Sequence, residues 1–161
     1  MQMRTLKVGD LVIHCRDGLA EISGQTKIND RDFFLVHIHR DSNETTYVPV
    51  VGAENIIRPI MTVEEANSII ELMNGISLEY NKNTKQRRDL FKKKLASGDV
   101  KEIAYLFRQY YLFKTHPDEV KIGPVDIDML SFATNNLLDE FSLTYNIPRD
   151  QIQEYIYKQM K

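Results

Sequence analysis

The chain has 161 residues, of which 42% are hydrophobic and 27% charged, so it can form one ordinary domain or two small ones. Its formal net charge of -2 excludes a uniformly basic nucleic-acid-binding protein, and its single cysteine excludes an intrachain disulfide. One cysteine, and the lack of an apolar run long enough for a membrane span or a signal peptide, lead us to expect a cytoplasmic protein without membrane contact.

The first 60 residues have the pattern of short β-strands separated by turns. The apolar and β-branched runs lie at 11–14, 18–22, 33–39, 45–50 and 56–60, and the turn residues at 17–18, 29–30 and 41–43. Pro59 restricts the last run to an edge of a sheet, because proline has no N–H to donate. Four or five short strands at this spacing predict a small antiparallel barrel or a strongly bent sheet.

From Thr62 onward the apolar residues repeat with the period of helices. Thr62 and Glu65 form the sequence pattern of a capping box, and Gly75 is expected to end this first helix. After a linker at 76–83, further helices are expected at about 84–97, 99–115, 126–145 and from Pro148 onward. The sequence therefore predicts an α+β chain in which a small β domain, residues 1–60, precedes a compact all-helical domain of about five helices, residues 61–161.

No set of residues with a catalytic arrangement stands out. Cys15 has no base beside it on the same strand face, so it is expected to be a small buried hydrophobe. His37 and His39 share one face of a predicted strand and form a possible metal pair, but no supporting ligand is evident at a suitable spacing. Asp126 is more simply explained as the cap of a helix. We therefore expect no catalytic residue, no metal and no cofactor, with a metal-dependent enzyme built on the two histidines as the least favoured alternative.

A basic segment at residues 82–94 has the clearest functional meaning. It holds seven basic residues and one acid, Asp89, so its local net charge is 7 − 1 = +6. On a helix with about 100° per residue, these side chains divide between two sides. The cationic side holds Lys85, Lys92 and Lys93, the apolar side holds Leu90, Phe91 and Leu95, and Arg87 and Lys94 fall beside the apolar side. The lysines could reach a phosphate backbone, whereas Arg87 and Lys94 would pack their stems and pair their heads with acids. From charge alone, a merely solvated helix face is equally compatible.

Several segments, in order along the chain, match one known family. They are Leu6–Val12, Asp17-Gly18, Tyr47–Val50, Ala53-Glu54, Ile57–Pro59, Lys85–Arg87, Lys94–Asp99 and, in the helix beyond, Met129, Leu130, Ala133, Leu137 and Glu140. Their order and spacing resemble the CarD-like family of bacterial transcription regulators. The resemblance extends over nearly the whole chain and rests on the order of the motifs rather than on any single one.

The resemblance implies a Tudor- or SH3-like β domain that docks on the β-subunit lobe of RNA polymerase. It also implies a helical domain that contacts the backbone of promoter DNA and alters the stability of the open complex, in a nucleoid-associated protein with no small-molecule substrate. The residues implied for polymerase binding are Lys27, Tyr47, Val48 and Pro49. The residues implied for DNA binding are Thr84, Lys85, Arg87, Arg88, Lys92 and Lys93.

The chain departs from the family where members commonly carry a tryptophan that wedges into the edge of the DNA bubble. It has no tryptophan, and Thr84 occupies that position. A threonine lacks the area and the π-face that hold a splayed base step. Tyr47 likewise stands where a basic residue is common. A protein-only adaptor, which binds polymerase or another protein without DNA contact, is therefore the alternative interpretation.

Overall fold

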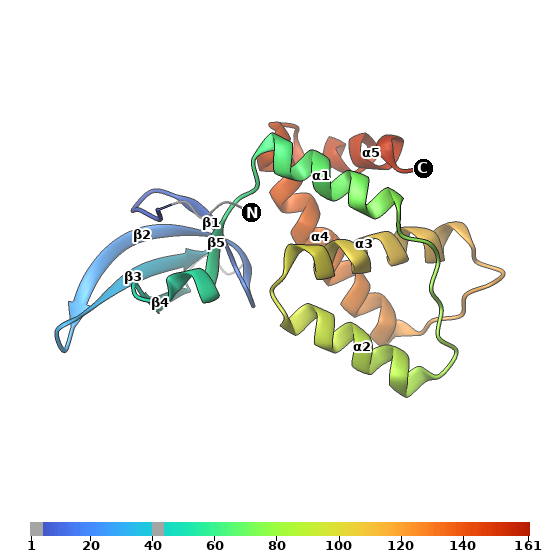
Figure 1. Ribbon diagram of the computed structural model, residues 1–161, viewed down its shortest axis with the longest axis horizontal. Helices are drawn as coiled ribbons and strands as arrows, with labels where there is room; N and C mark the ends of the chain where they lie inside the picture. Colours follow the sequence, from blue (N-terminus) through green and yellow to red (C-terminus); the bar gives the residue numbers. More distant parts are fainter. Residues whose placement is uncertain (1–4, 40–43) are drawn as a thin grey trace. The chain divides into compact units, whose positions relative to one another are not determined.

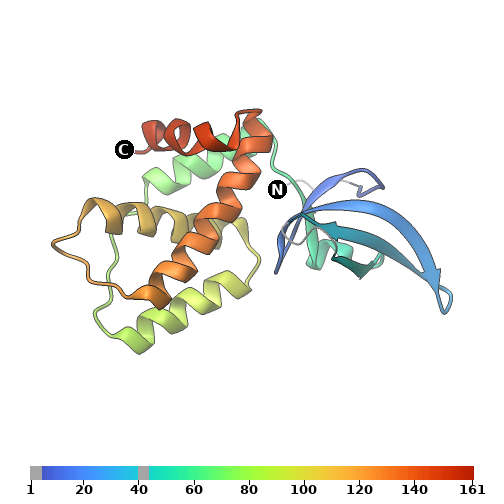
Figure 2. The same cartoon turned by 180° about the vertical axis from the view of Figure 1, so that it is seen from behind.

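The computed structural model describes residues 5–39 and 44–161, and the turn expected at 41–43 lies outside them. The chain divides into two compact units, Met1–Ile60 and Met61–Lys161. The first unit is a β-sheet and the second is helical, as Figures 1 and 2 show from opposite sides. The predicted α+β class, with the β part before the α part, is confirmed.

The β unit is one five-stranded antiparallel sheet with the order β4-β3-β2-β1-β5. Its strands are β1 (Leu11–His14), β2 (Gly18–Ile28), β3 (Arg31–Ile38), β4 (Thr45–Pro49) and β5 (Ile57–Pro59), with a short 3-10 helix, η1 (Ala53–Asn55), before the last. The sheet is strongly bent, which is plain along β2 in Figure 1. In the described residues the outer strands β4 and β5 do not pair with each other, so both present an edge.

One face of the sheet forms the core of this unit, because successive side chains of a strand point to opposite faces. In β3, Phe34, Val36 and Ile38 are buried, and the residues between them are partly exposed. They pack in one cluster with Val12, Ala20, Ile22, Val48, Ala53 and Ile57. The alternation that predicted the strands therefore also determines which side chains form the core.

Strand β2 continues to Ile28, six residues beyond the predicted run at 18–22. The added residues are mostly polar, so they carry no hydrophobic alternation that a sequence pattern could detect. They are ordered by pairing with β3 across a two-residue turn in which Asn29 and Asp30 have positive φ angles of 50° and 64°. Such a turn matches the twist of the two strands it joins, so local pairing rather than burial extends this hairpin.

The helical unit is built around α4. Its helices are α1 (Val63–Asn74), α2 (Thr84–Ala96), α3 (Val100–Thr115), α4 (Pro124–Tyr145) and α5 (Arg149–Gln159). Helix α4 contacts each of the other four (Figures 1 and 2). Phe107 of α3 and Phe141 of α4 meet edge to face in the main core. The predicted capping box of Thr62 and Glu65 is present. None of the described helices combines the length and the apolar character that crossing a membrane requires.

Two predictions about the burial of single side chains were wrong. Cys15 is exposed, because it lies in the turn after β1, where its backbone N–H donates to the carbonyl of Ile56 at 2.8 Å. The neighbouring His14 is buried instead, and burial lowers its pKa. Leu90, expected on the apolar side of its helix, is 41% exposed, because that side of α2 is centred on Arg87 and Phe91.

Candidate nucleic-acid interface

Helix α2 presents three lysines to solvent. It begins after Asn83, whose side chain caps it by accepting from the backbone N–H of Gln86 at 3.0 Å. Beyond this cap, Lys85, Lys92 and Lys93 are exposed, and we call them the exposed lysines. The side chain of Lys85 is 89% exposed, and its Nζ lies 3.4 Å from Asp89, its partner one turn along. Both charges of this pair are solvated, so it holds the lysine only weakly.

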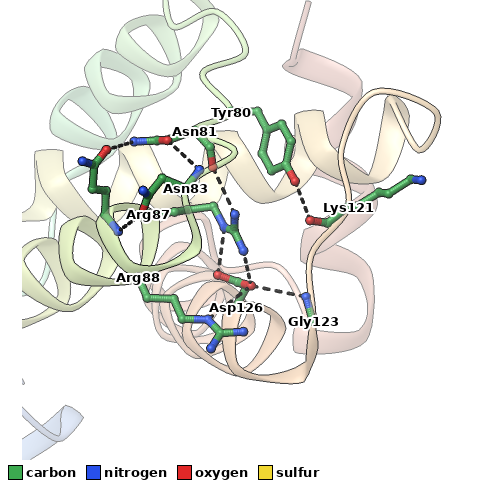
Figure 3. Close-up of polar contacts among 9 residues, drawn as sticks. Tyr80, Asn81, Asn83, Arg87, Arg88, Lys121, Gly123 and Asp126 are labelled. Atoms are coloured by element: carbon green, nitrogen blue, oxygen red, sulfur yellow. Dashed lines mark hydrogen bonds and ion pairs between the residues drawn. The ribbon is translucent and has the colours of Figure 1, made fainter.

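Arg87 points in the opposite direction, into the helical unit. Its Nε donates to Oδ1 of Asp126 at 3.1 Å and its NH2 donates to Oδ2 at 2.9 Å, and the two side chains are 5% and 0% exposed (Figure 3). NH1 donates to the carbonyl of Asn81 at 3.0 Å, and the guanidinium lies 5.5 Å from the centre of the Tyr80 ring. The expected pairing of Arg87 with an acid is confirmed, and its guanidinium does not face solvent.

Asp126 has two further contacts besides Arg87. The backbone N–H of Gly123 donates to Oδ2 at 3.2 Å, and Nε of Arg88 lies 3.6 Å from the same oxygen (Figure 3). The prediction that Asp126 caps its helix was therefore wrong in position. Helix α4 starts two residues earlier, with Gly123 as its N-cap and Pro124 in its first turn, so Asp126 is the third helical residue and reaches back to the cap.

The charges around Asp126 favour its ionised form. Burial by itself raises the pKa of a carboxyl group. Here the hydrogen bonds from Arg87 and Gly123 and the charge of Arg88 outweigh burial, so the pKa of Asp126 lies below its ordinary value of 3.8. Hydrogen bonding to Asp126 likewise raises the pKa of Arg87. The pair is thus an ion pair at neutral pH, and it ties the first turns of α2 and α4 together.

This ion pair has a consequence in acid. Because the pKa of Asp126 is lowered by folding, its contribution to stability is complete above the ordinary value of 3.8 and is lost as the pH falls through the lower value of the folded state. We expect the difference in free energy of unfolding between the parent and Asp126→Asn to shrink below about pH 4. Urea titrations of both proteins over this range measure it. A difference that stays constant down to pH 2.5 would show that Asp126 does not titrate as the geometry requires.

The segment before α2, predicted as a linker at 76–83, contains no helix or strand but is held by α3. The fully buried side chain of Gln109 accepts from the backbone N–H of Glu79 and donates to the carbonyl of Ser77, both at 2.9 Å. The side-chain amide of Gln109 thus pairs with one backbone donor and one backbone acceptor of residues 76–83, in the way that the backbone of a neighbouring strand would. Tyr80 adds a hydrogen bond from its hydroxyl to the carbonyl of Lys121 at 2.6 Å (Figure 3). The segment that leads into α2 is therefore held both by α3, through Gln109, and by the segment before α4, through Lys121.

The end of α2 is held by a second pair. Lys94 forms an ion pair with Glu102 of α3, and its Nζ lies 4.4 Å from the centre of the Tyr105 ring. This confirms the prediction that the ammonium group of Lys94 pairs with an acid.

The sequence did not reveal the residues that hold α2 and the segment before it, namely Asp126, Gln109 and Tyr80. Each of them contacts a residue far along the chain, so no local pattern marks it.

The residues implied for polymerase binding lie in the sheet. Tyr47 is 56% exposed on edge strand β4, whereas the next residue, Val48, is 1% exposed and belongs to the core. Pro49 is partly buried, and Lys27 is exposed near the tip of the β2–β3 hairpin. The structure therefore brings Tyr47 and Lys27 to the surface and keeps the side chain of Val48 in the core.

The two histidines have no metal-binding arrangement in the part of the chain that the structure describes. The rings of His37 and His39 are 6.0 Å apart between centroids, on one face as predicted. His39 lies 3.8 Å from the carboxylate of Glu21. No group of three or more His, Cys, Asp or Glu side chains among residues 5–39 and 44–161 is placed to hold a metal ion.

Comparison with known protein families assigns both units. Residues 6–61 match the family model described as CarD-like/TRCF RID domain. Residues 68–157 match the model described as CarD, C-terminal domain, and this match includes α2 and its partners on α3 and α4. A search of curated proteins gave no match.

Proposed function

Because the chain belongs to the CarD-like family, whose domains interact with RNA polymerase in transcription, we propose that it joins polymerase to promoter DNA. The β unit binds the β-subunit lobe, and the exposed lysines of α2 bind the DNA backbone. No covalent chemistry is needed, since a protein that binds the open complex better than the closed one shifts their ratio. A preference of about 1.4 kcal/mol changes that ratio tenfold.

The observation that carries the DNA part of this proposal is the division of charge on α2. Arg87 is buried against Asp126 and orients the helix, so that Lys85, Lys92 and Lys93 are exposed and can meet phosphates. Arg88, with 32% of its side chain exposed, can contribute from beside Asp126. Lysines of this kind act as point charges on the backbone and carry no base information. We therefore propose non-specific, salt-dependent contact with DNA and leave Arg87 out of it.

Thr84 has a smaller role in this proposal. It is exposed in the first turn of α2, beside the cap at Asn83. Its hydroxyl can donate to a phosphate, but it offers no ring to insert between bases. We therefore propose that this chain stabilises the open complex through contacts to the phosphate backbone of the DNA alone.

The polymerase part of the proposal uses the outer edge of β4. The N–H of Ile38 bonds to the carbonyl of Glu44, and the N–H of Val50 bonds to that of Asp32, so the alternation of an antiparallel pair turns the backbone N–H and C=O of Tyr47 away from β3. Within the described residues 5–39 and 44–161, strand β4 is an outer strand of the sheet, so these groups can pair with a strand of another protein.

A substitution at this edge tests the proposal. Tyr47→Pro removes the outward N–H without removing a hydrogen bond of the sheet, whereas Tyr47→Ala removes the side chain and keeps the N–H. We expect Tyr47→Pro to weaken binding to core RNA polymerase about tenfold or more beyond Tyr47→Ala. Titration of labelled protein with core polymerase measures both. Equal affinities for the two variants would rule out strand addition at β4.

The experiment that tests the proposal as a whole compares three affinities of the full chain, namely for core polymerase, for a promoter duplex and for a preformed polymerase–promoter complex. A transcription factor that touches both partners binds the complex more tightly than polymerase alone, and this gain falls when the exposed lysines are replaced. A chain that binds polymerase with no gain from DNA would instead be the protein-only adaptor.

A further inference from the structure

Met61, at the start of the helical unit, is held by α4 through both its backbone N–H and its backbone carbonyl. Its N–H donates to Oε2 of Glu140 at 2.7 Å, and its carbonyl accepts from the hydroxyl of Thr144 at 2.9 Å. The side chain of Met61 is 2% exposed and belongs to the main helical core. Backbone and side chain of this one residue are therefore both fixed within the helical unit.

The last strand of the β unit ends immediately before this point. Pro59 closes β5 and pairs with Val12 of β1, and its ring fixes its own φ angle. Only Ile60 lies between Pro59, the last residue of the sheet, and Met61, the first residue of the helical unit. The connection is thus a single residue, with no glycine- or serine-rich stretch.

The two hydrogen bonds between α4 and Met61 are not needed to begin helix α1. That helix already has a complete capping box, in which Thr62 accepts from the N–H of Glu65 and Glu65 accepts from the N–H of Thr62. Glu140 binds the residue before this cap, and Glu140 is itself buried, with 1% of the residue exposed. Two separate hydrogen bonds between α4 and the backbone of Met61 point to a role in fixing this residue rather than in starting the helix.

We propose that Glu140 and Thr144 are positioning residues that fix the first residue of the helical unit, so that the chain between β5 and this unit remains one residue long. This inference rests on the proposed function. Once the β unit is bound to polymerase, a short connection keeps the exposed lysines at a high effective concentration beside the DNA of the same complex, whereas a longer flexible one dilutes them. Glu140 and Thr144 thus strengthen the simultaneous engagement of both partners without touching either.

Two changes test this in the full chain. A Gly-Ser-Gly-Ser insertion between Ile60 and Met61 lengthens the connection, and the same insertion between the exposed residues Asp118 and Glu119 is the control for four extra residues. Thr144→Val removes the hydroxyl that donates to Met61, and Thr144→Ser retains it. The quantity measured is the gain, defined as the affinity for the polymerase–promoter complex divided by the affinity for core polymerase alone.

We expect the insertion after Ile60 to reduce the gain about tenfold and Thr144→Val to reduce it roughly two- to fivefold. The control insertion and Thr144→Ser should keep the parental gain, and every variant should keep the parental affinity for polymerase alone and for free duplex. A parental gain in both the insertion variant and Thr144→Val would overturn the inference and leave the proposed function standing. A parent that shows no gain at all would overturn the proposed function, and this inference with it.

Discussion

Replacing Asp126 by asparagine is expected to lower the free energy of unfolding of the helical unit by about 3–5 kcal/mol. The substitution leaves the guanidinium of Arg87, with 5% of its side chain exposed, without its charged partner. It also weakens the contact to the Gly123 N–H that starts α4. An uncompensated buried charge is among the few single changes with so large an effect. Chemical denaturation followed by circular dichroism measures the loss.

Two further variants isolate the cause of that loss. Asp89→Asn removes the partner of Lys85 in a pair whose side chains are 61% and 89% exposed, and we expect it to change stability by less than about 1 kcal/mol. The double variant Arg87→Met, Asp126→Leu removes both buried charges and should be more stable than Asp126→Asn alone. If the double variant is less stable than the single one, the loss comes from packing and not from the unpaired arginine.

Replacing Lys85, Lys92 and Lys93 together by alanine is expected to make the salt dependence of duplex binding markedly less steep. Each lysine that neutralises a phosphate contributes about 0.9 to the slope of log affinity against log salt, so three contribute about 2.7. The three side chains are exposed and lie outside the described cores, so folding should be unaffected. Fluorescence anisotropy with a labelled promoter duplex at several salt concentrations gives the slope.

A variant with the same change in net charge is the control for this prediction. Lys101, Lys121 and Lys158 are also exposed and lie in the same unit, but none is on α2. Their replacement by alanine should leave the slope close to that of the parent. If both triple variants lower the slope equally, DNA responds to the total charge and α2 is not its binding face.

The charge pattern of α2 shows how far sequence reasoning reached. Angular position alone separated Lys85, Lys92 and Lys93 from Arg87 and Lys94, and the structure has the first three exposed and the other two paired with acids. This worked because the side of a helix on which a residue lies depends only on its number along the helix. The family resemblance, by contrast, grouped Arg87 with the DNA contacts, since a motif marks where a residue stands and not which way it points.

The strands and helices were likewise determined locally. Hydrophobic period, turn residues and the capping pattern of Thr62 predicted the order of elements and most of their bounds. They did not predict residues 23–28 of β2, which are held by pairing with β3 rather than by burial. Nor did they place Cys15 and Leu90, whose exposure depends on what the rest of the chain covers.

What the sequence determined by itself is therefore the β-then-α division, most of the elements and the separation of Lys85, Lys92 and Lys93 from Arg87 and Lys94 on the basic helix, because each follows from the spacing of residues near one another in the chain. Only the tertiary structure decided that Asp126 binds Arg87, that Gln109 holds the segment before α2 and that Glu140 holds Met61. These partners are 39, 30 and 79 residues apart. A buried polar group takes whichever partner the fold brings within about 3 Å, and that choice is made by packing, which no local spacing records.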